Sequence, residues 1–440
     1  MAHTHLFRKF VLLLQAARRE HLQLTHRPAP ISMQDMEGWN RRKFMKTSLM
    51  ASVAGLSSSS LIAPVFADGQ NNTTRVAIIG AGIAGLNAAY HLKSIGVNAQ
   101  IYEARARVGG RIFSSTIENG LVLDIGAELI NTDHIDMLTL AKHFNIELFN
   151  KLQDAKEQAY PEEIYLFDGI RYDEANLVED LKMIAQQIGN DARMLYQNWS
   201  KYAPIFDRLS VADYLAHHQD KMPDSYIHEL IAMALRTEYG AELHESSALQ
   251  LLFLLPEVNG QAVNLLSYSD EAYAVVGGSA QITDALSQAL DGQIQLNTAL
   301  HSIEQVGKEY RLNFSNKTQV MADIVIVTIP FPALRNVRLN VPLPELFMRF
   351  IKETVLGANE KVLSGFSERF WRQANGFSLA AWTDLGFAEV WDETQRQPDP
   401  TPGVLNFFLG GDQARQLGKV SNISTLCNQF ITKLDEFIPG

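Results

Sequence analysis

The sequence predicts an α/β fold in which a Rossmann-like domain is interleaved with an α+β domain that carries a helical subdomain. Three observations support this prediction. Residues 75–111 follow the order strand, glycine-rich turn, helix, strand. Residues 133–255 show apolar spacing near 3.6 residues, which is typical of helices. A strongly apolar run at residues 323–330 predicts a further buried strand.

The first domain begins with a short apolar run, Val76 to Ile79, that predicts a buried parallel strand. A helical pattern from Ile83 to Ser94 follows and stops at Gly96. A second strand, Ala99 to Tyr102, ends in Glu103. This order is the beginning of a βαβ unit, which places the turn after the first strand at the edge where ligands bind.

The turn between the first strand and the helix carries Gly80, Gly82 and Gly85 in G-x-G-x-x-G spacing. Gly80 makes the tight turn, Gly82 allows backbone to approach a pyrophosphate, and Gly85 lets the helix pack close to the strand. The first helical turn, which contains Ile83 and Ala84, offers free N–H groups and a positive dipole end to phosphate. The turn therefore predicts a dinucleotide site.

Glu103 lies 23 residues after Gly80, where a carboxylate accepts hydrogen bonds from a ribose diol. A carboxylate there also disfavours a 2′-phosphate, which argues against NADP. The alternative is a glycine turn that binds nothing. The register of strand, turn, helix and acid favours a bound dinucleotide.

Residues 103–111, EARARVGGR, resemble the E-A-x-x-R-x-G-G-R signature of the flavin-containing amine oxidase family, which includes monoamine and polyamine oxidases. The resemblance implies FAD, and it implies a second contact from the Gly-Gly-Arg turn to the FAD pyrophosphate. An arginine suits this contact because its fork bonds two phosphate oxygens at once. The alternative is a solvated basic loop. The cofactor-binding residues predicted here are Glu103, Ala104, Arg105, Gly109, Gly110 and Arg111.

Residues 121–128, LVLDIGAE, resemble the family's D-x-G-A segment, which passes close to the flavin ring. Gly126 and Ala127 are expected to leave room for the isoalloxazine, with Glu128 in the same cofactor segment. Leu129 and Asn131 follow where relatives place residues that face the substrate.

The resemblance also bears on the substrate. Amino-acid oxidases of the family carry an arginine near this segment to hold the substrate carboxylate. No arginine lies between Arg111 and Arg171. This absence favours amines without a carboxylate.

Two later segments resemble family elements in which the chain returns to the FAD domain. Residues 273–290 resemble a V-x-G-G-x-x-x-L element, and residues 323–330 resemble an A-D-x-V-I-x-T-x-P strand. A strand at 294–300 is expected before the second segment, and in the family the backbone near its end brackets the adenine. Leu300 is the residue expected there. Two short strands, at 310–314 and 319–321, are expected as an excursion.

Residues 357–362, followed by Phe370 and Trp371, resemble the family's G-x-x-x-K segment with its downstream F-W. The matching lysine, Lys361, holds a water against flavin N5 in relatives. A cation there favours electron transfer to dioxygen because it stabilises the developing negative charge. Lys361 is the predicted catalytic residue, and the alternative is a surface lysine on a strand.

The resemblance covers residues 75–440 and implies two domains that alternate along the chain. An N-terminal extension and signal peptide is expected at 1–67. The FAD-binding domain is expected to comprise two stretches, 75–132 and 265–330. The substrate domain is expected to comprise residues 133–264, which carry the helical subdomain, and residues 331–440.

The N-terminal extension resembles a targeting segment. Residues 40–46, NRRKFMK, resemble a twin-arginine export motif, and residues 65–67 form a small-residue cleavage site. We expect bacterial export to the periplasm or medium, with the twin-arginine machinery as a partner. A membrane anchor is the alternative, but Pro64 and a serine run disfavour a stable span. Met33 or Met36 is a possible start.

The composition excludes some functions. The net charge is −11, and residues 1–46 hold nine basic and three acidic side chains, so residues 47–440 sum to −17. A body this acidic is a poor candidate for binding nucleic acid. Cys427 is the single cysteine, so no intramolecular disulfide and no cysteine-based metal site is expected. Cys427 matches no flavin-linking cysteine, so FAD is expected to be non-covalent.

The implied function is FAD-dependent oxidation of an amine to an imine, which hydrolyses, with dioxygen reoxidising the flavin to give hydrogen peroxide. Relatives continue beyond the position of Gly440 with a second flavin-contacting segment, so we expect that segment to be missing here. Two alternatives stay open at this point. One is a related flavin desaturase or protoporphyrinogen-type oxidase, and the other is a non-catalytic, truncated flavoprotein.

Overall fold

The computed structural model describes residues 74–117, 120–132, 134–254, 257–259, 262–264, 270–397 and 402–439. The predicted export signal at residues 1–67 lies outside the described residues. Within the described ranges, every helix is too short or too polar to cross a membrane.

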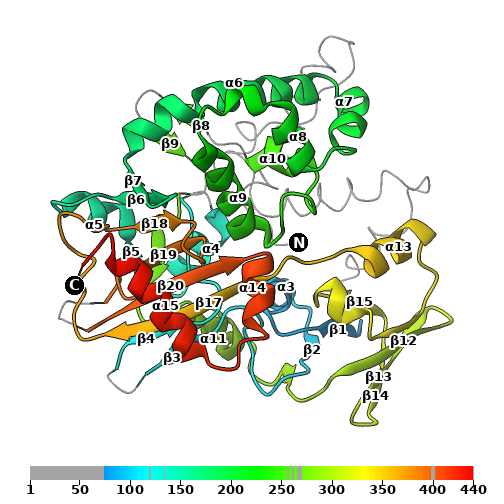
Figure 1. Cartoon of the computed structure of the whole chain (residues 1–440). Coiled ribbons are helices and arrows are strands. Elements are labelled where there is room, and N and C mark those ends of the chain that lie inside the picture. Colours follow the sequence, from blue (N-terminus) through cyan, green and yellow to red (C-terminus); the bar gives the residue numbers. More distant parts are fainter. Residues whose placement is uncertain are drawn as a thin grey trace.

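The first sheet is parallel and has four strands in the order β11-β2-β1-β15 (Figure 1). Its strands are β11 (Ile294–Gln295), β2 (Ala99–Tyr102), β1 (Val76–Ile79) and β15 (Ile324–Val327). Helices α3 (Ile83–Ser94) and α11 (Ala280–Ala289) share an apolar core with the sheet, in which Ile78, Leu86 and Leu286 are fully buried. The predicted Rossmann-like unit and its return strand are therefore confirmed.

The predicted strand at residues 294–300 is wrong in its length. β11 ends at Gln295, and Leu300 begins a strand of another sheet. Asn297 between them has φ of 54°, a left-handed conformation that breaks an extended strand. The second sheet has the order β14-β13-β12-β16 and contains the expected excursion. Its strands are β12 (Leu300–Val306), β13 (Glu309–Phe314), β14 (Gln319–Ala322) and β16 (Arg338–Asn340).

A third, six-stranded sheet has the order β17-β20-β19-β18-β6-β7. Its strands are β17 (Asn359–Phe366), β20 (Gly403–Gly410), β19 (Glu389–Asp392), β18 (Ala380–Thr383), β6 (Glu163–Phe167) and β7 (Ile170–Tyr172). One face packs on the C-terminal helix α15 (Ile423–Asp435), where Cys427 lies in the core. α14 (Asp412–Leu417) lies beside it. The other face packs on a group of helices.

That helical group lies above the sheet in Figure 1 and is coloured green. It consists of α6 (Glu174–Gln197), α7 (Trp199–Phe206), α8 (Val211–His217), α9 (Ser225–Tyr239) and α10 (Ala248–Leu254). α6 runs through Ile188 to Gln197 because its apolar stripe continues, and Asn198 then caps α7 by accepting from the Lys201 N–H.

The segment expected to be mostly helical, residues 133–255, also supplies strands. β6 and β7 join the six-stranded sheet, and β6 pairs in parallel with β18. The remaining elements are β3 (Ser114–Thr116), β4 (Val122–Asp124), α4 (Ile135–His143), β5 (Leu148–Asn150), α5 (Lys151–Glu157), η2 (Gln219–Lys221), β8 (Glu257–Asn259), β9 (Ala262–Asn264), β10 (Tyr273–Val275), α12 (Phe331–Leu334) and α13 (Glu345–Glu353).

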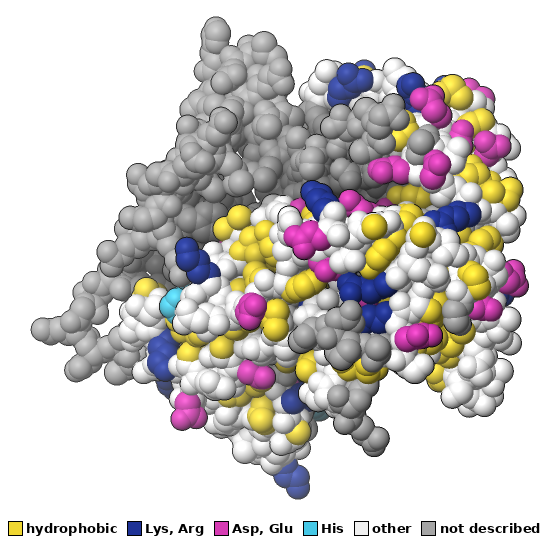
Figure 2. All heavy atoms as spheres, turned by 90° about the vertical axis from the view of Figure 1, so that its left-hand side faces the viewer, with side chains coloured by type: hydrophobic (Ala, Val, Ile, Leu, Met, Phe, Trp, Pro, Cys, Tyr) yellow, Lys and Arg dark blue, Asp and Glu magenta, His cyan; other side chains and the backbone are white. Residues whose placement is uncertain are grey.

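The described surface carries charges of both signs. In the view of Figure 2, basic and acidic side chains are interspersed among apolar ones over the part that is coloured. This part of the face shows no extended single-sign patch of the kind that marks a nucleic-acid site.

Candidate active site

The glycine turn after β1 leaves the start of α3 open. Gly80 has φ of 105°, and its N–H donates to the Tyr102 carbonyl at 2.9 Å. A Cβ on Gly85 would lie 2.0 Å from the Gly80 carbonyl oxygen, so only glycine fits there. Gly82 is the N-cap and supplies no capping side chain. The first N–H groups of α3, at Ile83 and Ala84, are thus left for an anion.

Glu103 ties this turn to the end of β2. Its Oε2 accepts the Ala81 N–H at 2.8 Å, and its Oε1 accepts the Arg105 N–H at 2.9 Å. Each carboxylate oxygen keeps a free lone pair, so a ribose diol can still donate to it. The chain just before Leu300 runs beside this carboxylate, since the Thr298 N–H donates to the Glu103 carbonyl at 2.7 Å.

The second predicted turn packs directly on the first. The Gly109 N–H donates to the Ala81 carbonyl at 2.9 Å, and Gly82 and Gly109 form a parallel bridge. Gly109 and Gly110 have φ of 94° and 62°, which favours glycine at both positions. The Arg111 side chain is exposed and makes no hydrogen bond or ion pair with the described residues. Its guanidinium is available for a phosphate.

These two turns fit the pyrophosphate and ribose of a dinucleotide. The glycines clear a backbone cradle that a Cβ would fill, the helix start supplies donors, and Glu103 supplies acceptors. Ala104 and Arg105 are exposed on the loop beside Glu103. The assignment of individual residues to the cofactor stays a prediction.

The predicted flavin-ring segment adjoins the second turn. The Ala127 N–H donates to the Arg111 carbonyl at 3.0 Å, and a Cβ on Gly126 would lie 2.1 Å from that same oxygen. Leu129 is half-buried. Asn131 is buried, and its carboxamide oxygen accepts the Glu271 N–H at 3.0 Å, so it holds a neighbouring loop.

Lys361 lies against this segment although 233 residues separate it from Glu128. From β17 its Nζ donates to the Asp124 carbonyl at 2.9 Å and to Glu128 Oε2 at 2.9 Å. The Lys361 side chain is 13% exposed, which excludes the surface lysine that the sequence left as an alternative. The Glu128 carboxylate is thus paired with Lys361, and its predicted contact with the cofactor stays a prediction.

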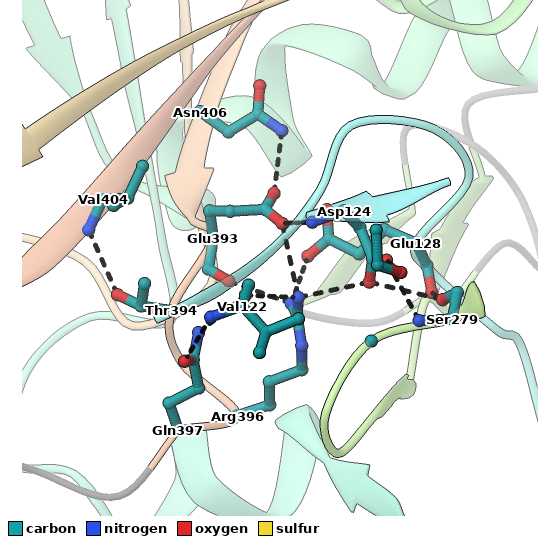
Figure 3. Close-up of polar contacts among 12 residues, drawn as sticks. Val122, Asp124, Glu128, Ser279, Glu393, Thr394, Arg396, Gln397, Val404 and Asn406 are labelled. Atoms are coloured by element: carbon teal, nitrogen blue, oxygen red, sulfur yellow. Dashed lines mark hydrogen bonds and ion pairs between the residues drawn. The ribbon is translucent and has the colours of Figure 1, made fainter. Parts of the chain in front are cut away.

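Sequence reasoning missed Arg396 and Glu393, which lie beside Asp124 and Glu128 (Figure 3). Arg396 Nη2 lies 3.2 Å from Asp124 Oδ2, and its Nη1 lies 3.3 Å from Glu128 Oε1. The Glu393 carboxylate accepts the Asp124 N–H at 2.6 Å and lies 3.7 Å from Lys361 Nζ. We call Asp124, Glu128, Lys361, Glu393 and Arg396 the ionic cluster.

The ionic cluster contains three acids and two bases, so a proton is favoured on one acid. Burial raises the pKa of Glu128, but Lys361, Lys151 and a hydrogen bond with Glu393 outweigh it and lower the pKa to about 2. Burial and the negative charge of Glu128 raise the pKa of Glu393 to about 8. Burial lowers the pKa of Lys361, but Glu128 and Glu393 raise it above its ordinary value. The two acids therefore favour the protonated form of Lys361.

Trp391 is a further neighbour that sequence reasoning missed. Its indole N–H donates to Glu128 Oε2 at 3.2 Å, and Lys361 Nζ lies 5.4 Å from the centre of its ring. Within the described ranges, no set of three His, Cys, Asp or Glu side chains is arranged to hold a metal ion.

The Rossmann-like sheet carries two glycine cradles, and the six-stranded sheet presents a buried lysine beside them. This is the architecture of a dinucleotide-dependent oxidoreductase. The family model described as "Flavin containing amine oxidoreductase" matches residues 83–439, and the chain belongs to this family. FAD is therefore the cofactor, and the reaction is the oxidation of an amine.

Curated relatives agree with this family. The chain is 26% identical over 362 residues to amine oxidase [flavin-containing] B of Canis lupus familiaris, covering 79% of this chain and 67% of that one. It is also 26% identical over 386 residues to the same-named protein of Mus musculus, with 83% and 72% covered.

Solved structures share the fold. Wild-type putrescine oxidase bound to putrescine superimposes with a TM-score of 0.70 at 22% identity, covering 83% of this chain and 81% of that one. Cyclohexylamine oxidase from Brevibacterium oxydans IH-35A gives a TM-score of 0.69 at 21% identity, with 83% and 82% covered.

Proposed function

We propose that the chain oxidises an amine that lacks a carboxylate, with dioxygen as the electron acceptor and Lys361 as the residue that serves the oxygen reaction. The single observation that carries this proposal is the contact of the Lys361 ammonium with the Asp124–Glu128 segment. The resemblance assigns that segment to the flavin ring. When bound, FAD takes up the hydrogen and electrons from the carbon next to nitrogen.

The charge of Lys361 suits the reaction with dioxygen. Negative charge develops on oxygen during electron transfer, and a fixed, partly buried cation stabilises it more than it would in water. Glu128 holds the ammonium in place and keeps it protonated, because it raises the pKa of Lys361 against the effect of burial. The protonated ammonium has three N–H donors and gives two to Asp124 and Glu128, so one donor remains for a water or an oxygen species.

The described arginines near this centre support an amine without a carboxylate. Arg396 is 1% exposed at its side chain, and it is shared among Asp124, Glu128 and Glu393. A substrate carboxylate would have to displace one of these acids from the buried guanidinium, which costs several kcal/mol. The ionic cluster therefore offers no open anion site.

The test is a visible spectrum of the FAD-loaded protein during anaerobic addition of simple amines and amino acids. We expect amines without a carboxylate to bleach the flavin and amino acids to leave it oxidised. Lys361→Met should slow reoxidation by dioxygen about 100-fold, on the scale of losing one preorganised charge, while bleaching by amine changes much less. Lys352→Met, at an exposed position on α13, is the matched control.

Three results would contradict the proposal. A flavin that no amine bleaches would favour the desaturase alternative. A protein that cannot be loaded with FAD would show that this chain belongs to the family but lacks its activity. A Lys361→Met variant that reacts with dioxygen as fast as the wild type would remove Lys361 from the oxygen reaction.

Export by the twin-arginine machinery to the bacterial periplasm or medium is also a proposal. The Arg41-Arg42 motif and the cleavage site at residues 65–67 support it. A protein that acquires FAD in the cytoplasm suits a route that carries folded proteins. Fractionation of a bacterial host that expresses the full chain tests this, and a product confined to the cytoplasm would contradict it.

A further inference from the structure

The ionic cluster holds one more acid than it has bases, and it holds them away from water. Asp124, Glu128 and Glu393 face the two cations Lys361 and Arg396. The Lys361 side chain is 13% exposed, and the other four are 3% exposed or less. An excess negative charge at this depth is costly, because the protein does not replace its hydration. The cluster is therefore most stable when one of its acids carries a proton.

The contacts of Glu393 identify it as the acid that carries this proton. Its side chain shares a hydrogen bond with Glu128, and two carboxyl groups can form one only when a proton lies between them. Glu128 accepts from Lys361 at 2.9 Å and lies 3.3 Å from Arg396, which favours its ionised form. The same two cations lie farther from Glu393, at 3.7 and 3.5 Å. Glu393 is thus the donor of the pair.

The surroundings of Glu393 keep it protonated near neutral pH. Burial and then the charge of Glu128 raise its pKa to about 8, and the nearby cations oppose this only in part. The charged groups that face it come from three parts of the chain: Asp124 and Glu128 from the segment after β4, Lys361 from β17, and Arg396 from the turn after β19. The neutral Asn406 amide on β20 donates to its Oε2 at 3.1 Å.

Hydrogen bonds lead from Glu393 to the Lys361 ammonium by way of Glu128. Glu393 bonds to Glu128, and Glu128 Oε2 accepts from Lys361 Nζ at 2.9 Å. Proton transfer between side chains requires hydrogen-bond contact of this kind. The ammonium has one N–H left after its bonds to Asp124 and Glu128, so it can donate to an oxygen species. The cluster therefore connects a stored proton to the place proposed for the oxygen reaction.

The oxygen reaction has a use for such a proton. Reduction of dioxygen to hydrogen peroxide consumes two electrons and two protons. When bound, FAD takes a hydride equivalent from the amine and so supplies two electrons and one proton. The second proton must come from the chain or from water.

We propose that Glu393 supplies the second proton of hydrogen peroxide through Glu128 and Lys361, an inference that rests on the proposed reaction with dioxygen. An N–H bond of Lys361 breaks as an O–H bond forms on the reduced oxygen. Glu128 then gives a proton to Nζ and takes one from Glu393. Glu393 is left as a carboxylate and regains a proton from water before the next turnover. The chain contributes no electrons, and Glu393 acts through Lys361 and not on oxygen directly.

The test reduces the FAD-loaded full chain with one equivalent of dithionite and follows its reoxidation by dioxygen from pH 6 to pH 10. We expect the wild-type rate to fall above about pH 8, where Glu393 loses its proton. Glu393→Gln keeps the size of the side chain but has no acid to give. It should react about 100-fold more slowly at pH 7, the scale of losing one general acid, and its rate should not change with pH.

Asp191→Asn is the matched control, because it removes a buried acid whose hydrogen bonds to Tyr214 and Gln187 lie within the helical group. It should keep the wild-type rate and pH profile. A Glu393→Gln variant that keeps the wild-type profile would overturn the proposal. If this variant does not hold FAD, the wild type decides, and a rate that is constant from pH 6 to pH 10 would also overturn it.

Infrared difference spectra between pH 6 and pH 10 give a readout that does not depend on activity. The wild type should lose a carboxylic acid carbonyl band that Asp191→Asn also loses and Glu393→Gln lacks. Identical spectra for the wild type and Glu393→Gln would overturn the assignment of the proton.

Reduction by dithionite separates this inference from the proposed function. If no amine bleaches the flavin, amine oxidation by this chain fails while the reoxidation experiment still stands. If the reduced protein does not react with dioxygen at any pH, the proposed acceptor fails and the role of Glu393 fails with it. Fast reoxidation that is independent of pH overturns the role of Glu393 alone.

Discussion

The glycine turns at residues 80–110 and the ionic cluster hold charged groups by different means. The turns present backbone N–H groups and open space, and the half-buried Glu103 carboxylate accepts two N–H donors beside them. The ionic cluster presents side chains, and its members come from positions 124 to 396. A backbone site depends on local geometry, whereas the cluster depends on charge balance among distant segments.

This difference has an energetic consequence. Loss of a glycine adds atoms where there is no room, and the resulting strain is confined to one turn. Loss of one charge in the ionic cluster leaves other buried charges without compensation. This destabilises the contact between the Asp124–Glu128 segment and the six-stranded sheet. The cluster should therefore be the more fragile of the two regions, and three variants measure this.

Arg396→Met tests the larger effect. It leaves Asp124, Glu128 and Glu393 with Lys361 as their remaining basic partner in the cluster, so the free energy of unfolding should fall by about 3–5 kcal/mol. Denaturant unfolding measures it. Arg415→Met is the control, because its pairs with Glu245 and Asp412 are partly exposed and should contribute about 1 kcal/mol or less. Similar losses of unfolding free energy in both variants would show that the ionic cluster stabilises the fold no more than an exposed ion pair does.

Gly85→Ala tests the glycine turn. The added Cβ would lie 2.0 Å from the Gly80 carbonyl oxygen, so α3 must move away from β1. We expect a loss of about 1–3 kcal/mol in stability and weaker FAD binding, measured by denaturant unfolding and by flavin titration. Gly189→Ala is the control on α6, where a Cβ meets nothing within 4 Å, and it should be neutral or stabilising by up to about 1 kcal/mol. Unchanged FAD affinity in Gly85→Ala would argue against the cradle.

Glu393→Gln tests the ionic cluster through the pH dependence of folding stability. The pKa of Glu393 is about 8 in the folded chain and near 4.5 when unfolded, so the unfolded state releases this proton first as pH rises. Glu393 therefore makes the wild type lose stability between about pH 4.5 and pH 8. The variant lacks this loss, so its stability relative to the wild type should rise over that range by at least about 1 kcal/mol. Melting curves at pH 5 and pH 8 measure it, and a constant difference would refute the assignment.

Much of the fold was predictable because its signals are local. The period of apolar residues identified β1, α3 and the presence of helices within residues 133–255, and the glycine spacing identified the turn that the structure shows. Errors arose where a local signal was weak. The predicted strand at residues 294–300 was too long, because Asn297 adopts a left-handed conformation and β11 ends at Gln295.

The candidate site divides along the same line. Gly80, Glu103 and Gly109 could be assigned from sequence because their spacing and the family resemblance determine their neighbours. Arg396 and Glu393 could not, because their neighbours in the chain do not reveal which distant charges they meet.

The sequence by itself determined the dinucleotide turn, the family and the choice of Lys361, since each depends on residues that are neighbours in the chain. The tertiary structure alone decided that Lys361 meets Glu128 and that Arg396 balances the buried acids. The physical reason is that burial and charge compensation are set by which strands pair. That pairing brings together residues as far apart in the chain as Glu128 and Arg396, which are separated by 268 positions.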